Sequence, residues 1–171
     1  MSNSMKKNRP ESQVHTIQPM YDSHSRILIL GSFPSVRSRE TGFFYGHPRN
    51  RFWKVISGLF GEAEPLTIPE KKALLLEKGI ALYDVIDSCT ITGSSDSSIR
   101  DVVPADLRPL LAAAEIRQIF CNGGTSFRLY RKYLEKQTGR EAVRLPSTSP
   151  ANAACHLERL LEEWRICLDF L

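Results

Sequence analysis

Two short segments far apart in the chain combine tight turns with small polar side chains of the kind that bind phosphate. The first is Gly-Ser-Phe-Pro-Ser at residues 31–35, and the second is Leu-Pro-Ser-Thr-Ser-Pro-Ala-Asn at residues 145–152. A third segment, residues 43–53, brings together aromatic rings, two arginines, a histidine and an amide. Hydroxyls and backbone amides bind phosphate oxygens, and aromatic side chains stack on planar rings. The combination favours a site that holds a phosphate backbone and stacks a nucleic-acid base.

The elements that must position these segments are apolar runs alternating with helical patterns. Strands are predicted at residues 26–30, 80–86, 117–121 and 141–145, and helices at residues 48–61, 67–78, 106–114, 125–137 and 153–168. Residues 92–101, which are rich in Gly and Ser, predict a surface loop. This alternation is typical of a three-layer α/β/α sandwich around a four-stranded parallel sheet. The loops after its strands converge on one crevice, so the first two polar segments are expected to meet there.

The chain is predicted to form one folded domain preceded by an arm. Residues 1–25 lack apolar periodicity and are expected to be a flexible N-terminal arm, either a plain tail or a basic segment that touches phosphates. Residues 26–171 are expected to form a single domain. A chain of 171 residues can bury a sizeable core without disulfide staples.

Composition and charge restrict which partners, cofactors and cellular location are expected for this chain. The formal net charge of +4 and the isoelectric point near 9.0 permit a polyanionic partner. The four cysteines include no Cys-x-x-Cys pair, so neither a metal site nor a cofactor is predicted. No signal peptide or apolar run of membrane length is visible in the sequence. A cytoplasmic protein with no membrane partner is therefore expected.

The order and spacing of the polar segments resemble the uracil-DNA glycosylase superfamily. Residues 31–35 are similar to the first motif of that superfamily, usually Gly-x-Asp-Pro or Gly-x-Asn-Pro, and residues 145–149 to its second, usually His-Pro-Ser or Asn-Pro-Ser. Residues 44–53 and 149–152 resemble the hypoxanthine-DNA glycosylase branch, also called DNA-deoxyinosine glycosylase. The resemblance spans residues 26–168 and implies the same sandwich and damaged DNA as the partner. The motifs require no more than a monomer.

One departure from the superfamily concerns the catalytic group. Phe33 stands where most relatives carry the Asp or Asn that positions water, and Leu145 replaces the polar residue of the second motif. The hypoxanthine branch shares the first loss, and the resemblance places the catalytic amide at Asn50. An amide carbonyl can orient a water toward an oxocarbenium-like sugar. The spacing alone favours an amide on a helix surface at Asn50, and the catalytic role is what the resemblance implies. His47 is the second catalytic candidate, as a donor to the base or a phosphate, or as a cap for the following helix.

The predicted base pocket combines the first polar segment with nearby aromatic and amide groups. An extruded base gains stacking and edge hydrogen bonds in such a pocket. Phe44 is the preferred stacking ring; Phe33, Phe43 and Tyr45 are further candidates, and all four can instead fill the core. Asp84 and Asp87 end a predicted strand near the crevice, where a carboxylate binds a purine edge, supports the sugar cation or forms a surface salt bridge. The predicted pocket residues are Gly31, Ser32, Phe33, Phe44, Asp87 and Asn122.

Contacts to the DNA backbone are predicted at two places. Hydroxyls and free amides before a helix hold phosphates without distinguishing sequence, although plain helix capping explains the same residues. Arginines near the crevice contact phosphate or form a solvated basic face. The predicted DNA-binding residues are Arg49, Arg51, Ser147, Thr148 and Ser149.

The function that these residues favour is that of a monofunctional glycosylase that excises hypoxanthine from DNA. No lysine stands in the motifs to act as a Schiff-base nucleophile. Three alternatives stay open. One is a non-catalytic module that binds lesions on the same fold, which the loss of the usual Asp or Asn at position 33 keeps in view. The others are a glycosylase directed at uracil or mismatches and a hydrolase of free nucleosides or nucleotides.

Overall fold

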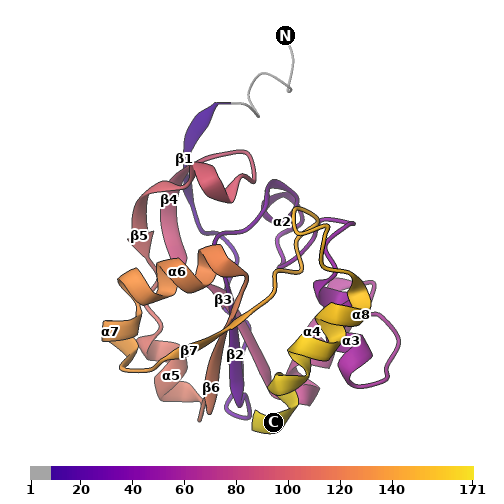
Figure 1. Cartoon of the computed structure of the whole chain (residues 1–171). Helices are drawn as coiled ribbons and strands as arrows, with labels where there is room; N and C mark the ends of the chain where they lie inside the picture. Colours follow the sequence, from indigo (N-terminus) through magenta and orange to yellow (C-terminus); the bar gives the residue numbers. More distant parts are fainter. Residues whose placement is uncertain (1–8) are drawn as a thin grey trace.

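A four-stranded parallel sheet forms the centre of the computed structural model, which describes residues 9–171 (Figure 1). Its strand order is β3-β2-β6-β7, and the predicted parallel pairing of four strands is confirmed. The central pairing places Ile27 opposite both Ile80 and Gln118. The strands are β2 (Ile27–Gly31), β3 (Ile80–Asp84), β6 (Gln118–Asn122) and β7 (Ala142–Leu145). Since all four point the same way, the loops after them gather at one edge.

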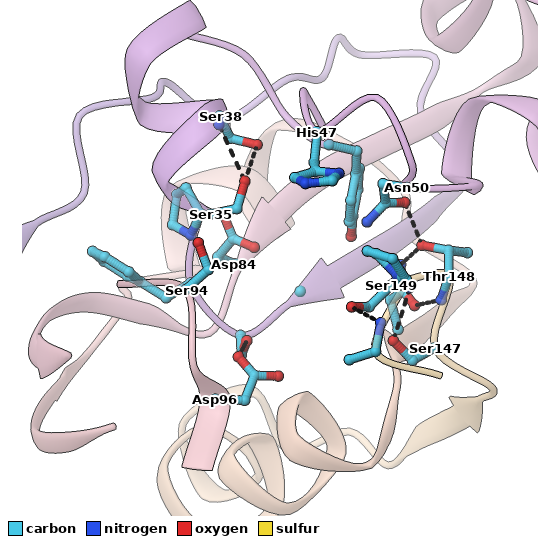
Figure 2. A pocket seen from close by; sticks show the side chains of 18 of the residues that line it. Ser35, Ser38, His47, Asn50, Asp84, Ser94, Asp96, Ser147, Thr148 and Ser149 are labelled. Carbon is cyan, nitrogen blue, oxygen red and sulfur yellow. Dashed lines mark hydrogen bonds between the residues drawn. The ribbon is translucent and has the colours of Figure 1, made fainter. Parts of the chain in front are cut away.

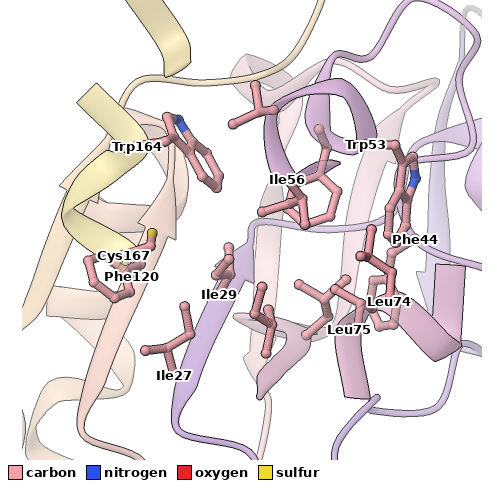
Figure 3. Close-up of a cluster of buried hydrophobic side chains, with 14 of the residues drawn as sticks. Ile27, Ile29, Phe44, Trp53, Ile56, Leu74, Leu75, Phe120, Trp164 and Cys167 are labelled. Carbon is pink, nitrogen blue, oxygen red and sulfur yellow. The ribbon is translucent and has the colours of Figure 1, made fainter. Parts of the chain in front are cut away.

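Helices cover both faces of this sheet because the fully buried strand β2 presents apolar side chains on each side. Ile27 and Ile29 pack against α3 (Phe52–Leu59), α4 (Ile68–Lys78) and α8 (Leu157–Trp164) (Figure 3). Leu28 and Leu30 join the second cluster with α5 (Arg108–Ala113) and α6 (Gly124–Tyr133). The short helix α7 (Glu135–Thr138) follows α6, and the 3₁₀ helix η2 (Arg165–Phe170) follows α8. The predicted three-layer sandwich is confirmed.

Several helices begin later than predicted because polar turns precede them. Residues 47–50 form a turn in which the Asn50 amide bonds the His47 carbonyl, so α3 begins at Phe52. Turns at residues 149–155 likewise delay α8 until Leu157. A short helix, α2 (Val36–Thr41), was not predicted; the Ser35 hydroxyl caps it and Gly42 ends it in the left-handed conformation. The backbone of both polar segments is thus set by local hydrogen bonds.

A second sheet, which the sequence did not predict, is antiparallel and has the order β1-β4-β5. Its strands are β1 (Pro10–Val14), β4 (Ile86–Thr92) and β5 (Arg100–Pro104). The predicted strand at 80–86 therefore divides, with its last residue belonging to another sheet. The predicted loop at 92–101 shortens to the turn at 93–95 and the 3₁₀ helix η1 (Asp96–Ser98). These differences bring the Ser-rich turn to the crevice.

The prediction of a flexible arm is wrong for residues 10–14, which form strand β1, and for the ordered segment that follows. The His15 amide donates to the Asp87 carbonyl at 2.7 Å, and Met20 pairs with Leu82 through two backbone hydrogen bonds. Residues 1–8 of the predicted arm lie outside the described residues. The N-terminal segment is therefore built onto the edge of both sheets. Among residues 9–171, no helix has the length and apolar character needed to cross a bilayer.

Candidate active site

A cavity of about 560 Å³ lies at the carboxyl edge of the parallel sheet (Figure 2). It is lined by the ends of β2, β3 and β6, by the loop after β7, by residues 44–50 and by the turn at 94–97. This volume falls in the range of small-molecule sites and accommodates a nucleobase. The two polar segments, 31–35 and 147–151, meet across it as predicted.

Arg51 joins the loop before α3 to the loop after β7. Its guanidinium donates to the carbonyl oxygens of Ser149 at 3.0 Å, Asn152 at 3.1 Å and Cys155. Its backbone amide donates to the Thr148 carbonyl at 3.1 Å. The side chain is half-buried and directed at protein carbonyls, so its predicted contact with phosphate is wrong in this arrangement. Arg51 fixes the shape of the pocket wall instead.

A chain of hydrogen bonds runs from Asn122 through Thr148 to Asn50. The Asn122 side chain exchanges two bonds with Thr148, accepting from its amide at 3.0 Å and donating to its hydroxyl at 2.9 Å. The Thr148 hydroxyl donates in turn to Asn50 Oδ1 at 2.8 Å (Figure 2). Thr148 is fully buried, so its hydroxyl positions Asn50 and is not free for DNA. Gly123 permits this approach, because its φ is +96° and a Cβ there would lie 3.0 Å from Ser147 Cβ.

The side-chain amide of Asn50 faces the cavity with its nitrogen. Oδ1 accepts from the Phe52 backbone amide at 2.9 Å as well as from Thr148. Because a backbone N–H can only donate, the assignment of Oδ1 is fixed, and both of its lone pairs are occupied. The group left for a ligand is therefore the donor Nδ2. The expectation that the Asn50 carbonyl orients water is wrong for this conformation.

His47 lies on the rim of the cavity and is exposed. Its Nδ1 accepts from the Arg49 backbone amide at 3.0 Å, a bond inside the turn that precedes α3. The predicted cap of the following helix is wrong, because α3 begins at Phe52 and His47 bonds none of its amides. Since the Arg49 amide can only donate, the neutral ring carries its proton on Nε2. Figure 2 shows His47 and Asn50 together on one side of the pocket. The two side chains thus both offer N–H donors there.

Aromatic side chains form the apolar part of the cavity. Phe33 and Phe44 both line it, although each is more than nine-tenths buried. Tyr45 also lines it and stacks on Phe52 with ring centroids 4.1 Å apart. Burial and the neighbouring Asp84 carboxylate raise the pKa of the Tyr45 phenol, so this hydroxyl stays protonated at neutral pH. The walls suit a flat ring, and the tyrosine adds a polar atom.

Two acidic side chains, Asp84 and Asp96, line the cavity. Asp84 at the end of β3 lines it, whereas the predicted Asp87 is exposed on β4 and lies outside it. The chain leaves the parallel sheet at Asp84 and enters the antiparallel sheet at Ile86, so Asp87 belongs to another strand than Asp84. Asp96 lines the opposite rim and accepts from the Ser32 hydroxyl at 2.9 Å, while burial raises the pKa of its carboxyl group. Among residues 9–171, no three His, Cys, Asp or Glu come together at metal-binding distance.

The model of the Uracil DNA glycosylase superfamily matches residues 18–168 of this chain. The chain belongs to the uracil-DNA glycosylase superfamily. Its function in outline is that of a DNA glycosylase, a hydrolase of DNA repair. Phe33, which by resemblance stands at the position of the usual acid or amide, is buried.

Relatives from methanogenic archaea share much of this sequence and fold. A hypoxanthine DNA glycosylase of Methanosarcina acetivorans is 33% identical over 132 residues, which are 77% of this chain and 83% of that relative. Another, from Methanosarcina barkeri, is 33% identical over 84 residues, which are 48% of this chain and 53% of the relative. The solution NMR structure of a candidate uracil DNA glycosylase from M. acetivorans is 32% identical. The match covers 89% of this chain and 94% of that one, with a TM-score of 0.76.

The remaining predicted DNA contacts lie where a glycosylase can use them. Ser147 and Ser149 line the cavity, and each hydroxyl oxygen accepts a backbone amide two residues onward, which leaves its own proton free to donate. Arg49 is exposed beside the rim residue His47. These three side chains remain our candidates for phosphate contact.

Replacing Thr148 with valine is expected to lower base release by roughly 10-fold and stability by about 1–3 kcal/mol. The change leaves Asn122 Nδ2 without its partner and removes the bond that holds Asn50. Single-turnover kinetics and thermal melting measure the two effects. Thr90→Val on β4, whose hydroxyl has no side-chain hydrogen bond in the described chain, is the control. Equal effects of the two substitutions would contradict the positioning role.

Proposed function

We propose that this chain is a monofunctional DNA glycosylase that hydrolyses the glycosidic bond of hypoxanthine in DNA. The observation that carries the proposal is the pairing of the Asn50 and His47 donors with an aromatic-walled cavity of nucleobase size. The 33% identity to a hypoxanthine DNA glycosylase over 83% of its length supports the same substrate. Residues that line the cavity in the described chain include no lysine, which is consistent with the absence of a lyase step.

The target base leaves the duplex and enters the cavity between the aromatic walls. Extrusion costs a few kcal/mol, which stacking at roughly 1–3 kcal/mol per base and edge hydrogen bonds offset. Ser147 and Ser149 hold the backbone at the rim through their free hydroxyl protons. Binding is consequently salt-dependent, because the phosphates contacted release their counterions.

The hydrolysis needs a water molecule and a proton for the departing purine. The water oxygen forms a bond to C1′ while the C1′–N9 bond breaks, and the bonding electrons leave with the base. The oxygen added to C1′ then loses one proton to solvent and the departing base takes one up, so the products are a sugar hydroxyl and neutral hypoxanthine. A water that accepts from Asn50 Nδ2 keeps a lone pair for C1′ and is positioned without being deprotonated, which suits an oxocarbenium-like sugar. His47 Nε2–H donates to an acceptor of the purine and stabilises the electrons that it receives. Asn50 thus acts through its amide nitrogen.

A second candidate function is a lesion-binding module without chemistry. Phe33 supplies no polar group at the position of the usual acid or amide, and the Asn50 oxygen is occupied, so binding without hydrolysis is compatible with the same cavity. The two functions differ in their product. A glycosylase releases free base and leaves an abasic site that alkali cleaves, whereas a binding module only retards the duplex in a gel.

The experiment that tests the proposal mixes excess protein with a duplex carrying one deoxyinosine. Free hypoxanthine is measured by mass spectrometry, abasic sites by alkaline cleavage, and complex formation by gel retardation. Release of hypoxanthine in step with abasic sites is the expected result, and free deoxyinosine is expected to react far more slowly than the duplex. Retardation without release would overturn the proposal in favour of the binding module.

A further inference from the structure

A carboxyl group from the second sheet reaches the cavity that the parallel sheet forms. Asp96 begins η1, in the connection between β4 and β5, and residues 94–97 of this connection line the cavity. Neither polar segment of the sequence contains it, and the predicted loop at residues 92–101 carried no assigned role. The steps assigned to Asn50 and His47 do not use this side chain.

Hydrogen bonds to the loop after β2 and to α2 fix the position of Asp96. The amide that begins α2 donates to the Ser94 hydroxyl at 2.9 Å, and the Arg39 guanidinium donates to the Gly93 carbonyl at 2.9 Å. Asp96 Oδ1 itself accepts from the Ser32 hydroxyl at 2.9 Å. The carboxyl group is therefore held at a defined place on the rim although it lies on a short turn.

The second carboxyl oxygen of Asp96 is available to a ligand. Among residues 9–171, no donor bonds Oδ2, whereas Ser32 occupies Oδ1. Figure 2 shows Asp96 on the side of the cavity opposite Asn50 and His47. A base that lies in the cavity therefore has two N–H donors on one side and this carboxyl group on the other.

The surroundings of Asp96 favour its protonated form. Although the residue as a whole is exposed, desolvation of its carboxyl group raises the pKa, and the Asp84 carboxylate adds to the increase. Asp84 faces the same cavity and is bonded by His15 Nε2 at 2.8 Å. Two carboxyl groups that share one cavity resist ionising together, and this arrangement separates an acid from a carboxylate.

The other polar groups around Asp96 oppose this effect only in part. The Ser32 hydroxyl and the Arg128 guanidinium of α6 favour the carboxylate, yet the pKa of Asp96 stays above its ordinary value. The Tyr45 phenol faces the same space and remains neutral, because burial and the nearby carboxylates raise its pKa. The carboxyl group of Asp96 can therefore carry a proton into the cavity.

A purine that departs from this cavity needs such a proton. Leu145, which by resemblance stands at the position of the polar residue of the second motif, is buried and apolar, so it does not stabilise a base that leaves as an anion. Hypoxanthine has two unprotonated ring nitrogens beside the glycosidic bond, N3 on one edge and N7 on the other. N7 is the more basic of the two while that bond is intact. Groups on opposite walls of one cavity can meet both edges.

We propose that Asp96 is the general acid that protonates N7 of the departing hypoxanthine. This inference rests on the proposed function and names the source of the proton. The Asp96 Oδ2–H bond breaks and an N7–H bond forms while the C1′–N9 bond breaks, so the base leaves as neutral hypoxanthine. The water that attacks C1′ releases one proton to solvent, and the Asp96 carboxylate recovers one from solvent. His47 donates a hydrogen bond to the other edge and keeps its proton, and Ser32 is a positioning residue.

The first test measures the effect of Asp96→Asn against pH. Asparagine keeps an acceptor for the Ser32 hydroxyl but cannot give up a proton. Single-turnover release of hypoxanthine is expected to fall ~100-fold at pH ~5.5 and less than ~10-fold at pH ~8, because a smaller fraction of Asp96 is protonated as the pH rises. Titration of His47 affects both proteins alike and cancels in their ratio.

Asp101→Asn is the matched control, because it makes the same change on β5 at an exposed residue that does not line the cavity. Its rate is expected to equal that of the unaltered protein at every pH, and thermal melting checks that both variants are folded. A loss in Asp96→Asn that is the same at every pH would show that Asp96 only holds Ser32. That result, or no loss at all, would overturn the inference.

The second test uses the unaltered protein, so it does not depend on the folding of a variant. Duplexes carry deoxyinosine, 7-deaza-2′-deoxyinosine or 3-deaza-2′-deoxyinosine, in which a C–H replaces one ring nitrogen. Release of 7-deazahypoxanthine is expected to be ~10²–10⁴-fold slower than release of hypoxanthine, and slower than release of 3-deazahypoxanthine. Release of 7-deazahypoxanthine as fast as 3-deazahypoxanthine would overturn the inference and leave the proposed function intact. No release of hypoxanthine itself would overturn the proposed function.

Discussion

Replacing Asn50 with alanine is expected to lower single-turnover release of hypoxanthine by ~10²–10³-fold, the usual effect of removing one positioned donor. Nδ2 is the part of Asn50 left free for substrate or water, since Phe52 and Thr148 occupy Oδ1. Binding to the same duplex is expected to change by less than a few-fold, because phosphate contacts dominate affinity. Rapid-quench kinetics and gel retardation measure the two quantities.

The control for Asn50→Ala is Lys54→Ala, at an exposed position of α3, the helix that follows Asn50. Asn50→Asp adds a sharper comparison, because it keeps an acceptor for Phe52 and Thr148 and replaces the free donor by a second oxygen. If the donor is what matters, Asn50→Asp is as slow as Asn50→Ala. Full activity of the aspartate variant would mean that an acceptor at this position orients the water, contrary to the atomic assignment.

Replacing Arg51 with methionine is expected to cost about 3 kcal/mol of stability and to abolish most base release. Methionine fills much of the same volume but leaves three carbonyl oxygens of the loop after β7 without their charged donor. For a domain of this size such a loss lowers Tm by roughly 6–12 °C. Thermal melting at matched ionic strength measures the loss of stability. Single-turnover kinetics at a temperature below the melting transition measures the loss of base release that follows from the displaced loop.

Arg49→Met is the matched comparison, because Arg49 is exposed in the same loop. We expect its Tm to be unchanged, its DNA binding to weaken, and the slope of log K against log salt to fall by about 1. An unchanged Tm for Arg51→Met together with the weakened, less salt-dependent binding expected of Arg49→Met would show that the Arg51 guanidinium contacts phosphate instead of the loop.

The parallel sheet could be predicted from the sequence because each strand leaves a strong local signal. The run at 27–31 is buried on both faces, and such strands are continuously apolar. The crossing of residues 31–35 and 147–151 at one pocket then follows from the topology alone. Asn122 could be proposed from its place at the end of a predicted strand, whereas Asn50 was proposed from the resemblance to the hypoxanthine branch, because its spacing alone indicates a helix-surface amide.

The second sheet and its histidine could not be predicted in the same way. Strand β1 reads Pro-Glu-Ser-Gln-Val and is mostly exposed, so it carries no apolar alternation. What orders it is pairing with β4, a contact between segments about 75 residues apart, as in the pairing of Val14 with Ser88. His15 becomes buried through that pairing, and no signal in its neighbours marks it. The choice of Asp87 over Asp84 failed for a related reason, since the strand leaves the sheet between them.

The sequence could not predict which atom of each site residue faces a ligand. The sequence places an amide at residue 50, but an amide offers either an acceptor or two donors. Which one faces a ligand depends on Phe52 and on Thr148, which is 98 positions away. The role of Arg51 was equally hard to predict from the sequence, because its carbonyl partners come from the loop after β7. These hydrogen bonds hold the loop in place and leave the guanidinium unavailable for the predicted contact with DNA.

The most direct test of the central claim compares two duplexes that differ in one base. Unaltered protein in excess is mixed with a duplex containing a single deoxyinosine or a single deoxyuridine, and the free base is measured over time. We predict that hypoxanthine is released and that uracil is released much more slowly. The reason is that Leu145 offers no polar group to a departing uracil anion and Phe33 offers none to a water molecule, and both residues are buried. Release of uracil alone, or binding without release of either base, would contradict the account.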